Sequence, residues 1–232
     1  MSTRLSAARR ARGHAGEAFR SAQAPQILLT APVFRPTVTG APGSRFDGEE
    51  ERVAFVPGFD HDVFISYAHI DNERSRWVTK LAKELELRLA EQLGGRPMIW
   101  MDDKIRGNEP LTQIMDCLQK AATLLLIHSQ ASVLSGWCRK EVVSFMASQN
   151  AERNRVFLVR TKPFDASSEP MNLRDLPGYT FWREDGGIVL RLGTLEAGGK
   201  DRKYATELAR LATQLAETLT DAVRIAEQAG QR

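Results

Sequence analysis

The sequence predicts an α/β fold in which a doubly wound sheet of five parallel strands carries helices on both faces. Two patterns predict it. Short apolar runs rich in β-branched and aromatic residues are typical of strands buried on both faces, and they alternate with longer segments whose apolar residues recur at helical spacing. The order of these segments is strand, helix, strand, helix, strand, helix, strand, then a loop, a strand and a last helix. Right-handed crossovers between the strands then place helices on both sides of the sheet.

The predicted strands are five short apolar runs, and each predicted helix has one apolar stripe. In the first helix, Trp77, Leu81 and Leu85 share one face, and Gly94 follows its end. Pro110 stands at the start of the second helix, where proline is favoured. The strands are expected at residues 63–65, 98–101, 123–127, 156–159 and 179–182, and the helices at 77–93, 111–118, 133–147 and 201–228.

Ligands of such a sheet bind beyond the carboxyl ends of the strands, near the point where the strand order reverses. A functional site is therefore expected among residues 66–72, residues 102–110, and the loop and helix that follow residue 127.

The N-terminal segment, residues 1–58, differs in composition from the rest. Up to residue 45 the chain has seven arginines, no lysine and one acidic residue, Glu17, among Ala, Ser, Gly and Pro. Because this segment lacks the spacing needed to bury an apolar face, we expect residues 1–58 to be a disordered leader and residues 59–232 to be one domain. An arginine-rich, acid-poor start also resembles an organelle transit peptide, and an over-long start in an arginine- and alanine-rich proteome has the same composition.

Composition argues against several partners and compartments. The 32 Lys and Arg are balanced by 29 Asp and Glu, with both signs interspersed, so no direct nucleic-acid partner is expected. No run approaches the roughly 20 apolar residues that a membrane span requires. The four histidines have no ligand-like spacing with each other or with the cysteines, so no metal site is expected. With two cysteines outside any CxxC pair and no secretory signal, we expect a cytoplasmic protein.

Several common occupants of doubly wound folds are also excluded. A dinucleotide-binding site of the dehydrogenase type requires GxGxxG after the first strand, where residues 66–69 read Ser-Tyr-Ala-His. The sequence has no P-loop motif and no GxSxG nucleophile elbow. A receiver domain would place an aspartate at the end of the third strand, where this chain has His128 and Ser129.

One carboxylate breaks the pattern of the third helix. At about 100° of rotation per residue, Glu141 falls inside an apolar arc, whereas Arg139 and Lys140 lie outside it. Burying a carboxylate is costly unless it is paired or used. Glu141 is therefore either half of a structural ion pair or a functional group. The arc consists of Leu134, Trp137, Cys138, Val142, Phe145 and Met146.

Three segments resemble the signature segments of the TIR (Toll/interleukin-1 receptor) domain family in order and spacing. Residues 59–68 read Phe-Asp-His-Asp-Val-Phe-Ile-Ser-Tyr-Ala, residues 99–107 read Ile-Trp-Met-Asp-Asp-Lys-Ile-Arg-Gly, and residues 135–141 read Ser-Gly-Trp-Cys-Arg-Lys-Glu. The resemblance runs from residue 59 to the last helix. It implies a flavodoxin-like TIR fold.

The Trp-x-x-x-Glu pair resembles that of the enzymatic TIR domains of bacterial type, in which the glutamate is the catalytic residue of NAD⁺ cleavage. The resemblance implies that Glu141 is catalytic and that Trp137 packs against the substrate. It also implies that Ser66 and Tyr67 line the pocket at the end of the first strand. A strand-end cap, a surface aromatic and plain core packing remain the structural alternatives for these three flanking residues.

By the same resemblance, Asp102, Ile105 and Gly107 form the end of the second strand and the BB loop beside the substrate. The structural alternatives for Asp102 and Gly107 are an Asx turn and a tight turn.

The resemblance implies an NAD⁺ nucleosidase that releases nicotinamide and ADP-ribose or a cyclic isomer of ADP-ribose, in bacterial antiphage defence or immune signalling. NAD⁺ is then the substrate, and no cofactor is needed. Expected partners are other copies of the chain, through TIR–TIR contacts, and an activating protein or ligand-sensing partner. The alternative is a non-catalytic TIR module that recruits other TIR domains.

Overall fold

The computed structural model describes residues 53–101, 111–148, 155–164, 173, 176, 178–198 and 202–230. Five strands form one parallel sheet in the order β2-β1-β3-β4-β5, which confirms the predicted fold class. The chain starts at β1 and moves outward in one direction to β2, then in the other through β3, so the order reverses between β1 and β3. The strands are β1 (His61–Ser66), β2 (Ile99–Met101), β3 (Ala121–His128), β4 (Val156–Arg160) and β5 (Gly178–Thr180).

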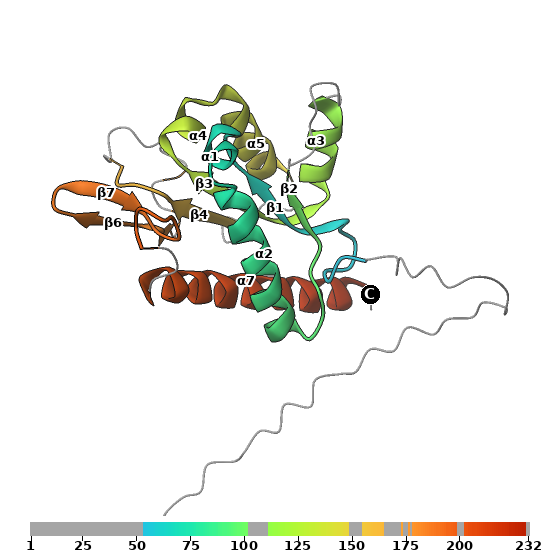
Figure 1. Cartoon of the computed structure of the whole chain (residues 1–232). Coiled ribbons are helices and arrows are strands. Elements are labelled where there is room, and N and C mark those ends of the chain that lie inside the picture. The colour runs from blue at the N-terminus through green and yellow to red at the C-terminus, as the bar shows by residue number, and fades with distance from the viewer. Residues whose placement is uncertain are drawn as a thin grey trace, which may run out of the picture. The chain divides into compact units, whose positions relative to one another are not determined.

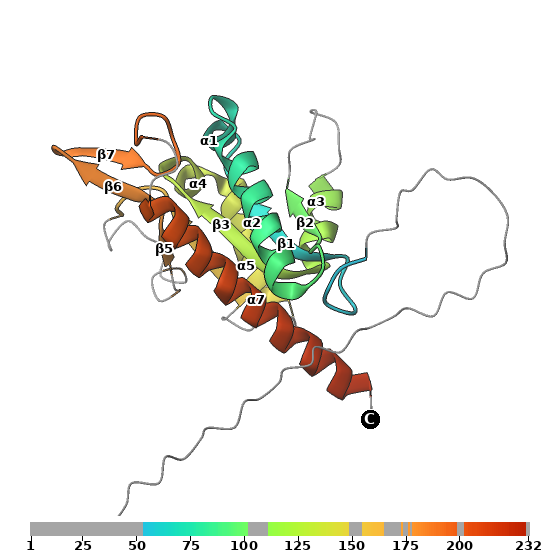
Figure 2. The ribbon, with the colours of Figure 1, turned by 60° about the horizontal axis from the view of Figure 1, so that its bottom comes forward.

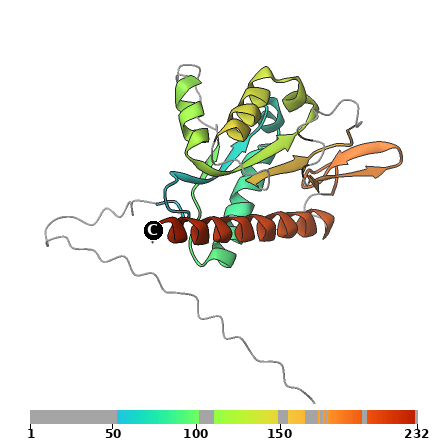
Figure 3. The ribbon, with the colours of Figure 1, turned by 180° about the vertical axis from the view of Figure 1, so that it is seen from behind.

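Helices cover both faces of this sheet. The helices α2 (Trp77–Leu93) and α7 (Arg202–Gly230) lie side by side on one face, and α3 (Leu111–Gln119) and α5 (Gly136–Ala147) lie on the other (Figure 1 and Figure 3). Two short helices, α1 (Ile70–Glu73) and α4 (Gln130–Leu134), follow the carboxyl ends of β1 and β3.

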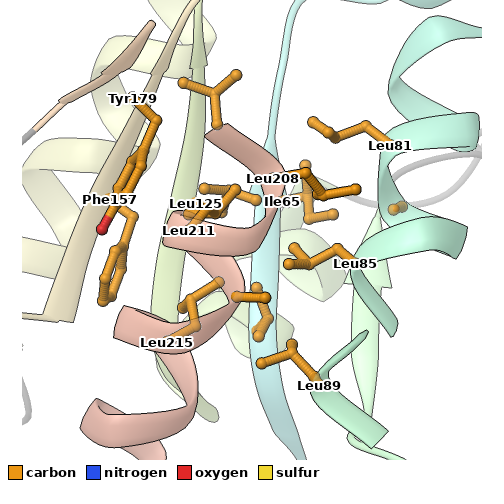
Figure 4. Packing of buried hydrophobic residues seen from close by; sticks show 14 of the residues in the cluster. Ile65, Leu81, Leu85, Leu89, Leu125, Phe157, Tyr179, Leu208, Leu211 and Leu215 are labelled. Carbon is orange, nitrogen blue, oxygen red and sulfur yellow. The ribbon is translucent and has the colours of Figure 1, made fainter. Parts of the chain in front are cut away.

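Each face of the sheet has its own hydrophobic cluster. Alternate residues of β1 point to opposite faces, so Ile65 packs among the residues of α2 and α7 whereas Phe64 packs beneath α3 and α5. In Figure 4, Ile65 lies between side chains of α2, such as Leu85, and side chains of α7, such as Leu208. All eight residues of β3 are buried, which makes it the central strand of the domain.

The helix α2 ends as its sequence predicts. Gly94 takes a left-handed conformation with φ of 70°, and its N–H donates to the carbonyl of Ala90, as a glycine C-cap does. The long last helix is also confirmed. Its buried stripe extends to Ala222, and its final turns run past the end of α2 (Figure 2).

The predicted strand at 179–182 is in fact two elements. β5 ends at Thr180, and Trp182 begins an antiparallel hairpin of β6 (Trp182–Asp185) and β7 (Ile188–Arg191). Gly186 and Gly187 both have positive φ, 57° and 80°, as a two-residue hairpin turn requires. The glycine pair between two short strand-like runs was the signal for this hairpin.

The single predicted helix at 133–147 is broken. Ser135 is extended, with ψ of 112°, and it ends α4 and caps α5. The apolar arc expected for one continuous helix therefore does not reach Leu134, which is 74% exposed. Ser135 and Gly136, a helix-capping residue followed by a poor helix former, explain the break.

The packed part of the domain starts earlier than residue 59. Val56 is fully buried, and Phe55 packs against the same cluster. The carboxylate of Asp62 attaches this segment, because it accepts hydrogen bonds from the backbone N–H groups of Phe55 and Val56, both at 2.9 Å, and of Met98 at 2.7 Å. Residues 1–52 of the expected leader lie outside the described residues.

We predict that Asp62→Asn lowers the free energy of unfolding by about 2 kcal/mol. Both carboxylate oxygens of Asp62 accept hydrogen bonds from backbone N–H groups. An amide in its place would put an NH₂ group, itself a donor, against one of these N–H groups, and that hydrogen bond would be lost. Urea unfolding of the two proteins measures the difference. Asp60→Asn is the control, since Asp60 forms an exposed ion pair with Lys120. An unfolding midpoint for Asp62→Asn equal to that of the control would contradict the prediction.

Candidate functional site

The carboxyl end of β1 meets the buried face of α5 at a hydrogen bond between Ser66 and Glu141. The Ser66 hydroxyl donates to Oε2 of Glu141 at 2.5 Å. Ser66 is 1% exposed and Glu141 is 4% exposed, so this contact is shielded from bulk water. The sequence-predicted carboxylate is therefore buried at the edge of the sheet where ligands of this fold class bind.

Local sequence explains why Glu141 faces inward. The hydroxyl of Ser135 accepts from the backbone N–H of Cys138 at 3.2 Å, and this cap sets the start of α5. Residues three and four apart on a helix share a face. Cys138, Glu141 and Phe145 accordingly form one buried stripe, which confirms this part of the predicted arc.

The thiol of Cys138 lies next to this contact. Burial raises the pKa of Cys138, whereas hydrogen bonds with the side chains of Ser135 and Ser66 act in the opposite direction. The nearby carboxylates of Glu141 and Asp71 raise the pKa of this thiol further. Cys138 is therefore a neutral thiol at physiological pH.

The other predicted site residues fall in different places. Trp137 lies one turn before Glu141 and packs, partly buried, against the same cluster. Tyr67 is 7% exposed and packs in the cluster on the opposite face of the sheet, with its ring 5.6 Å from that of His69. The structure thus brings Ser66 and Trp137 to the side of Glu141 and directs Tyr67 away from it. Asp102, Ile105 and Gly107 lie outside the described residues.

A second buried carboxylate, Asp71, stands at the same edge of the sheet. Its Oδ2 accepts from the Ser129 hydroxyl at 2.5 Å, and its Oδ1 is 3.3 Å from the guanidinium of Arg191. Burial raises the pKa of Asp71, and the bonds to Ser129 and Arg191 lower it. Sequence reasoning did not single out Asp71, although its position in the 66–72 segment after the first strand was a signal.

A small cavity of about 30 Å³ lies beside Cys138, with His128, Ser132 and Arg139 among its lining residues. It has room for no more than about two water molecules, so it does not hold a nucleotide. Among the described ranges, His, Cys, Asp and Glu side chains form no group of three that could ligate a metal ion. In the same ranges no helix has the length and apolarity needed to cross a bilayer.

Comparison with known proteins identifies the family. The TIR domain family model matches residues 63–189, more than half of the chain. The chain therefore belongs to the TIR domain family.

Two relatives are similar to parts of the chain. Over 97 residues it is 27% identical to the Disease resistance-like protein DSC1 of Arabidopsis thaliana, an alignment that covers 42% of this chain and 7% of that protein. Among solved structures, it is similar to the TIR domains of the activated Roq1 resistosome directly recognizing the pathogen effector XopQ. That similarity has 18% identity and a TM-score of 0.35, and it covers 71% of this chain and 84% of the other.

We predict that Ser66→Ala lowers the free energy of unfolding by about 2 kcal/mol, because it removes a hydrogen-bond donor from a buried carboxylate. Chemical unfolding followed by circular dichroism measures the change. Ser148→Ala is the matched control, since the Ser148 hydroxyl donates to the neutral carbonyl of Phe145 at the end of the same helix. If both variants lose the same free energy of unfolding, the Ser66–Glu141 bond stabilises the fold no more than an ordinary hydrogen bond to a neutral carbonyl.

Proposed function

We propose that this TIR domain cleaves the bond between nicotinamide and ribose in NAD⁺, with Glu141 as the catalytic residue. The observation that carries the proposal is the buried carboxylate of Glu141, 4% exposed and held by the Ser66 hydroxyl at the carboxyl edge of the sheet. Membership of the TIR domain family supports it, because the Trp137–Glu141 spacing resembles that of the enzymatic members.

The chemistry requires one carboxylate. The nicotinamide of NAD⁺ is already a cationic leaving group, so no second carboxyl group is needed to protonate it. The C1′–N bond breaks, and its electron pair leaves with the nitrogen, which becomes neutral. A carboxylate beside the ribose stabilises the positive charge that develops on the sugar, and the low-polarity surroundings strengthen this effect. Water then adds to C1′ and loses a proton, or a nucleophile of the same molecule closes a ring.

Ser66 contributes orientation in this mechanism. Its hydroxyl occupies one lone pair of Oε2 and holds the carboxylate in one rotamer. A preorganised group loses little reorganisation energy when charge develops. We propose Trp137, in the turn before Glu141, as a side chain that packs against the substrate.

We further propose that copies of this enzyme associate with one another and that an activating partner switches on their activity. The proposed role is immune signalling, such as bacterial antiphage defence. Exposed apolar side chains support this assembly. Ile70 on α1 is 65% exposed and Leu134 on α4 is 74% exposed. A hydrogen bond from Ser129 to Asp71 joins the two elements that carry them. We propose that these two neighbouring elements form part of the surface through which copies of the chain associate.

We predict that Glu141→Gln keeps the fold and lowers NAD⁺ cleavage by at least about 10² to 10³-fold, the usual effect of losing one transition-state stabiliser. Incubation of the purified full chain with NAD⁺, with products separated by chromatography, measures it and distinguishes ADP-ribose from a cyclic isomer.

The matched control is Glu207→Gln. Glu207 is also a buried glutamate, 8% exposed, but it lies on α7, where it bonds Arg210 and the backbone of Thr180. Full activity in a folded Glu141→Gln protein would refute the catalytic assignment and leave Glu141 as a structural group.

We predict that specific activity rises with protein concentration and that Leu134→Asp lowers it about tenfold at a fixed concentration, the loss expected when about 1.4 kcal/mol of association energy is removed. Leu87→Asp, on α2 and 55% exposed, is the control. Activity assays paired with light scattering measure both quantities. Activity strictly proportional to enzyme concentration, from a species that stays monomeric, would rule out the assembly.

A further inference from the structure

Two hydrogen bonds between buried side chains join the end of β1 and the helix that follows it to the segment that carries Glu141. One is the Ser66–Glu141 bond at 2.5 Å, and the other is the Ser129–Asp71 bond at 2.5 Å. In sequence, Asp71 follows Ser66 by five positions, and Glu141 follows Ser129 by twelve. The two bonds therefore fix the helix pair α4 and α5 against the end of β1 at two separate points.

Asp71 contacts Ser129, the residue that caps the N-terminus of α4. The Ser129 hydroxyl accepts from the backbone N–H of Ser132 at 3.0 Å, while the Ser132 hydroxyl accepts from the backbone N–H of Ser129 at 2.9 Å. This reciprocal cap matters because α4 has only five residues, and a helix that short does not hold itself together in water. Asp71 fixes the cap in place, since its carboxylate accepts a hydrogen bond from the same Ser129 hydroxyl.

The position of α5 depends on that of α4. Ser135 belongs to both helices: its backbone N–H donates to the carbonyls of Ala131 and Ser132 at the end of α4, and its hydroxyl accepts from the N–H of Cys138 at the start of α5. Displacement of α4 would therefore move the first turns of α5, where Trp137, Cys138 and Glu141 lie. A shift of about 1 Å at a catalytic group is enough to lower a rate by about a hundredfold.

The counter-ion of the Asp71 carboxylate is Arg191, which belongs to the β6–β7 hairpin. Arg191 of β7 places its guanidinium 3.3 Å from Oδ1 of Asp71 and also donates to the backbone carbonyl of the same residue at 3.3 Å. The guanidinium carbon of Arg191 lies 5.2 Å from the centre of the Trp77 ring, so it is held between α1 and α2. The hairpin that sequence analysis missed thus supplies the counter-ion of this contact.

We propose that Asp71, with Arg191 as its counter-ion, is a positioning residue that holds the cap of α4 and thereby keeps Glu141 in its place against Ser66. This inference rests on the proposed NAD⁺ cleavage for its catalytic consequence. Its structural part, the position of α5, does not depend on any activity.

The test uses Asp71→Ala and Ser129→Ala in the full chain, with two readouts. The first is steady-state NAD⁺ cleavage. Because Asp71 acts on the orientation of Glu141, kcat should fall at least about tenfold while KM changes less than about twofold. Arg191→Lys, which keeps the charge, should retain more activity than Arg191→Met. Asp71→Asn keeps the shape of the side chain and an oxygen that can accept from Ser129, so kcat should fall less than in Asp71→Ala. This variant replaces Asp71→Ala in the test if the alanine variant does not fold.

The second readout is the rate at which iodoacetamide alkylates Cys138 in the native protein, followed by mass spectrometry so that Cys117 is counted separately. Cys138 is 2% exposed and lies on the first turns of α5. Loosening of α4 and α5 should raise its alkylation rate at least about tenfold, because local opening then becomes easier. Ser129→Ala decides this readout, because it keeps the Asp71 carboxylate, whose loss would by itself lower the pKa of Cys138 and speed alkylation. Asp62→Asn is the control for general destabilisation, since Asp62 is buried at the opposite end of β1.

Lower kcat and faster Cys138 alkylation in both variants, with neither change in Asp62→Asn, would support the proposal. The same changes in an equally destabilised Asp62→Asn protein would overturn it, and so would unchanged alkylation in Ser129→Ala. If the wild-type chain does not cleave NAD⁺, the proposed function fails, and the alkylation rates alone decide whether Asp71 positions α5.

Discussion

The burial of β3 on both faces is the constraint on which the rest of the structure depends. All eight residues of this strand are buried, so each face of the sheet needs its own layer of helices. The α2 and α7 pair supplies one layer, and the α3 and α5 pair supplies the other. Because β1 pairs with β3 in parallel, the carboxyl ends of both strands open at one edge. Ser66, the last residue of β1, and the residues that follow the two strands, including Asp71 and Ser129, are brought together there.

Three of the buried carboxylates in the described ranges, those of Asp62, Asp71 and Glu141, accept hydrogen bonds from neutral donors. Backbone N–H groups surround Asp62, whereas serine hydroxyls approach Asp71 and Glu141. Burial raises the pKa of Asp62 and of Asp71, and the hydrogen bonds oppose that rise. Asp62 lies at the amino end of β1 and attaches the incoming chain. Asp71 and Glu141 lie at the carboxyl end, the edge of the sheet at which ligands of this fold class bind.

The helix pair α4 and α5 shows how far periodicity predicts structure. The apolar arc correctly places Cys138, Glu141 and Phe145 inside, because these residues belong to one regular helix. It fails for Leu134, because the extended Ser135 ends the helical register before α5 begins.

The β6–β7 hairpin was missed for a related reason. Its strands are short, half-exposed and paired with each other outside the main sheet, so they lack the continuous apolar character of central strands.

The sequence by itself determined the parallel five-stranded sheet, its long last helix, the three signature segments and the anomalous position of Glu141. These features depend on local spacing and on the types of residue that two-sided burial requires. The tertiary structure alone decided which groups meet. Alternation along β1 sends Ser66 to Glu141 and Tyr67 to the opposite face. The contact of Asp71 with Ser129 and Arg191 spans 58 and 120 positions in the chain. No local pattern encodes such pairs, because they form only when separate strands and helices pack together.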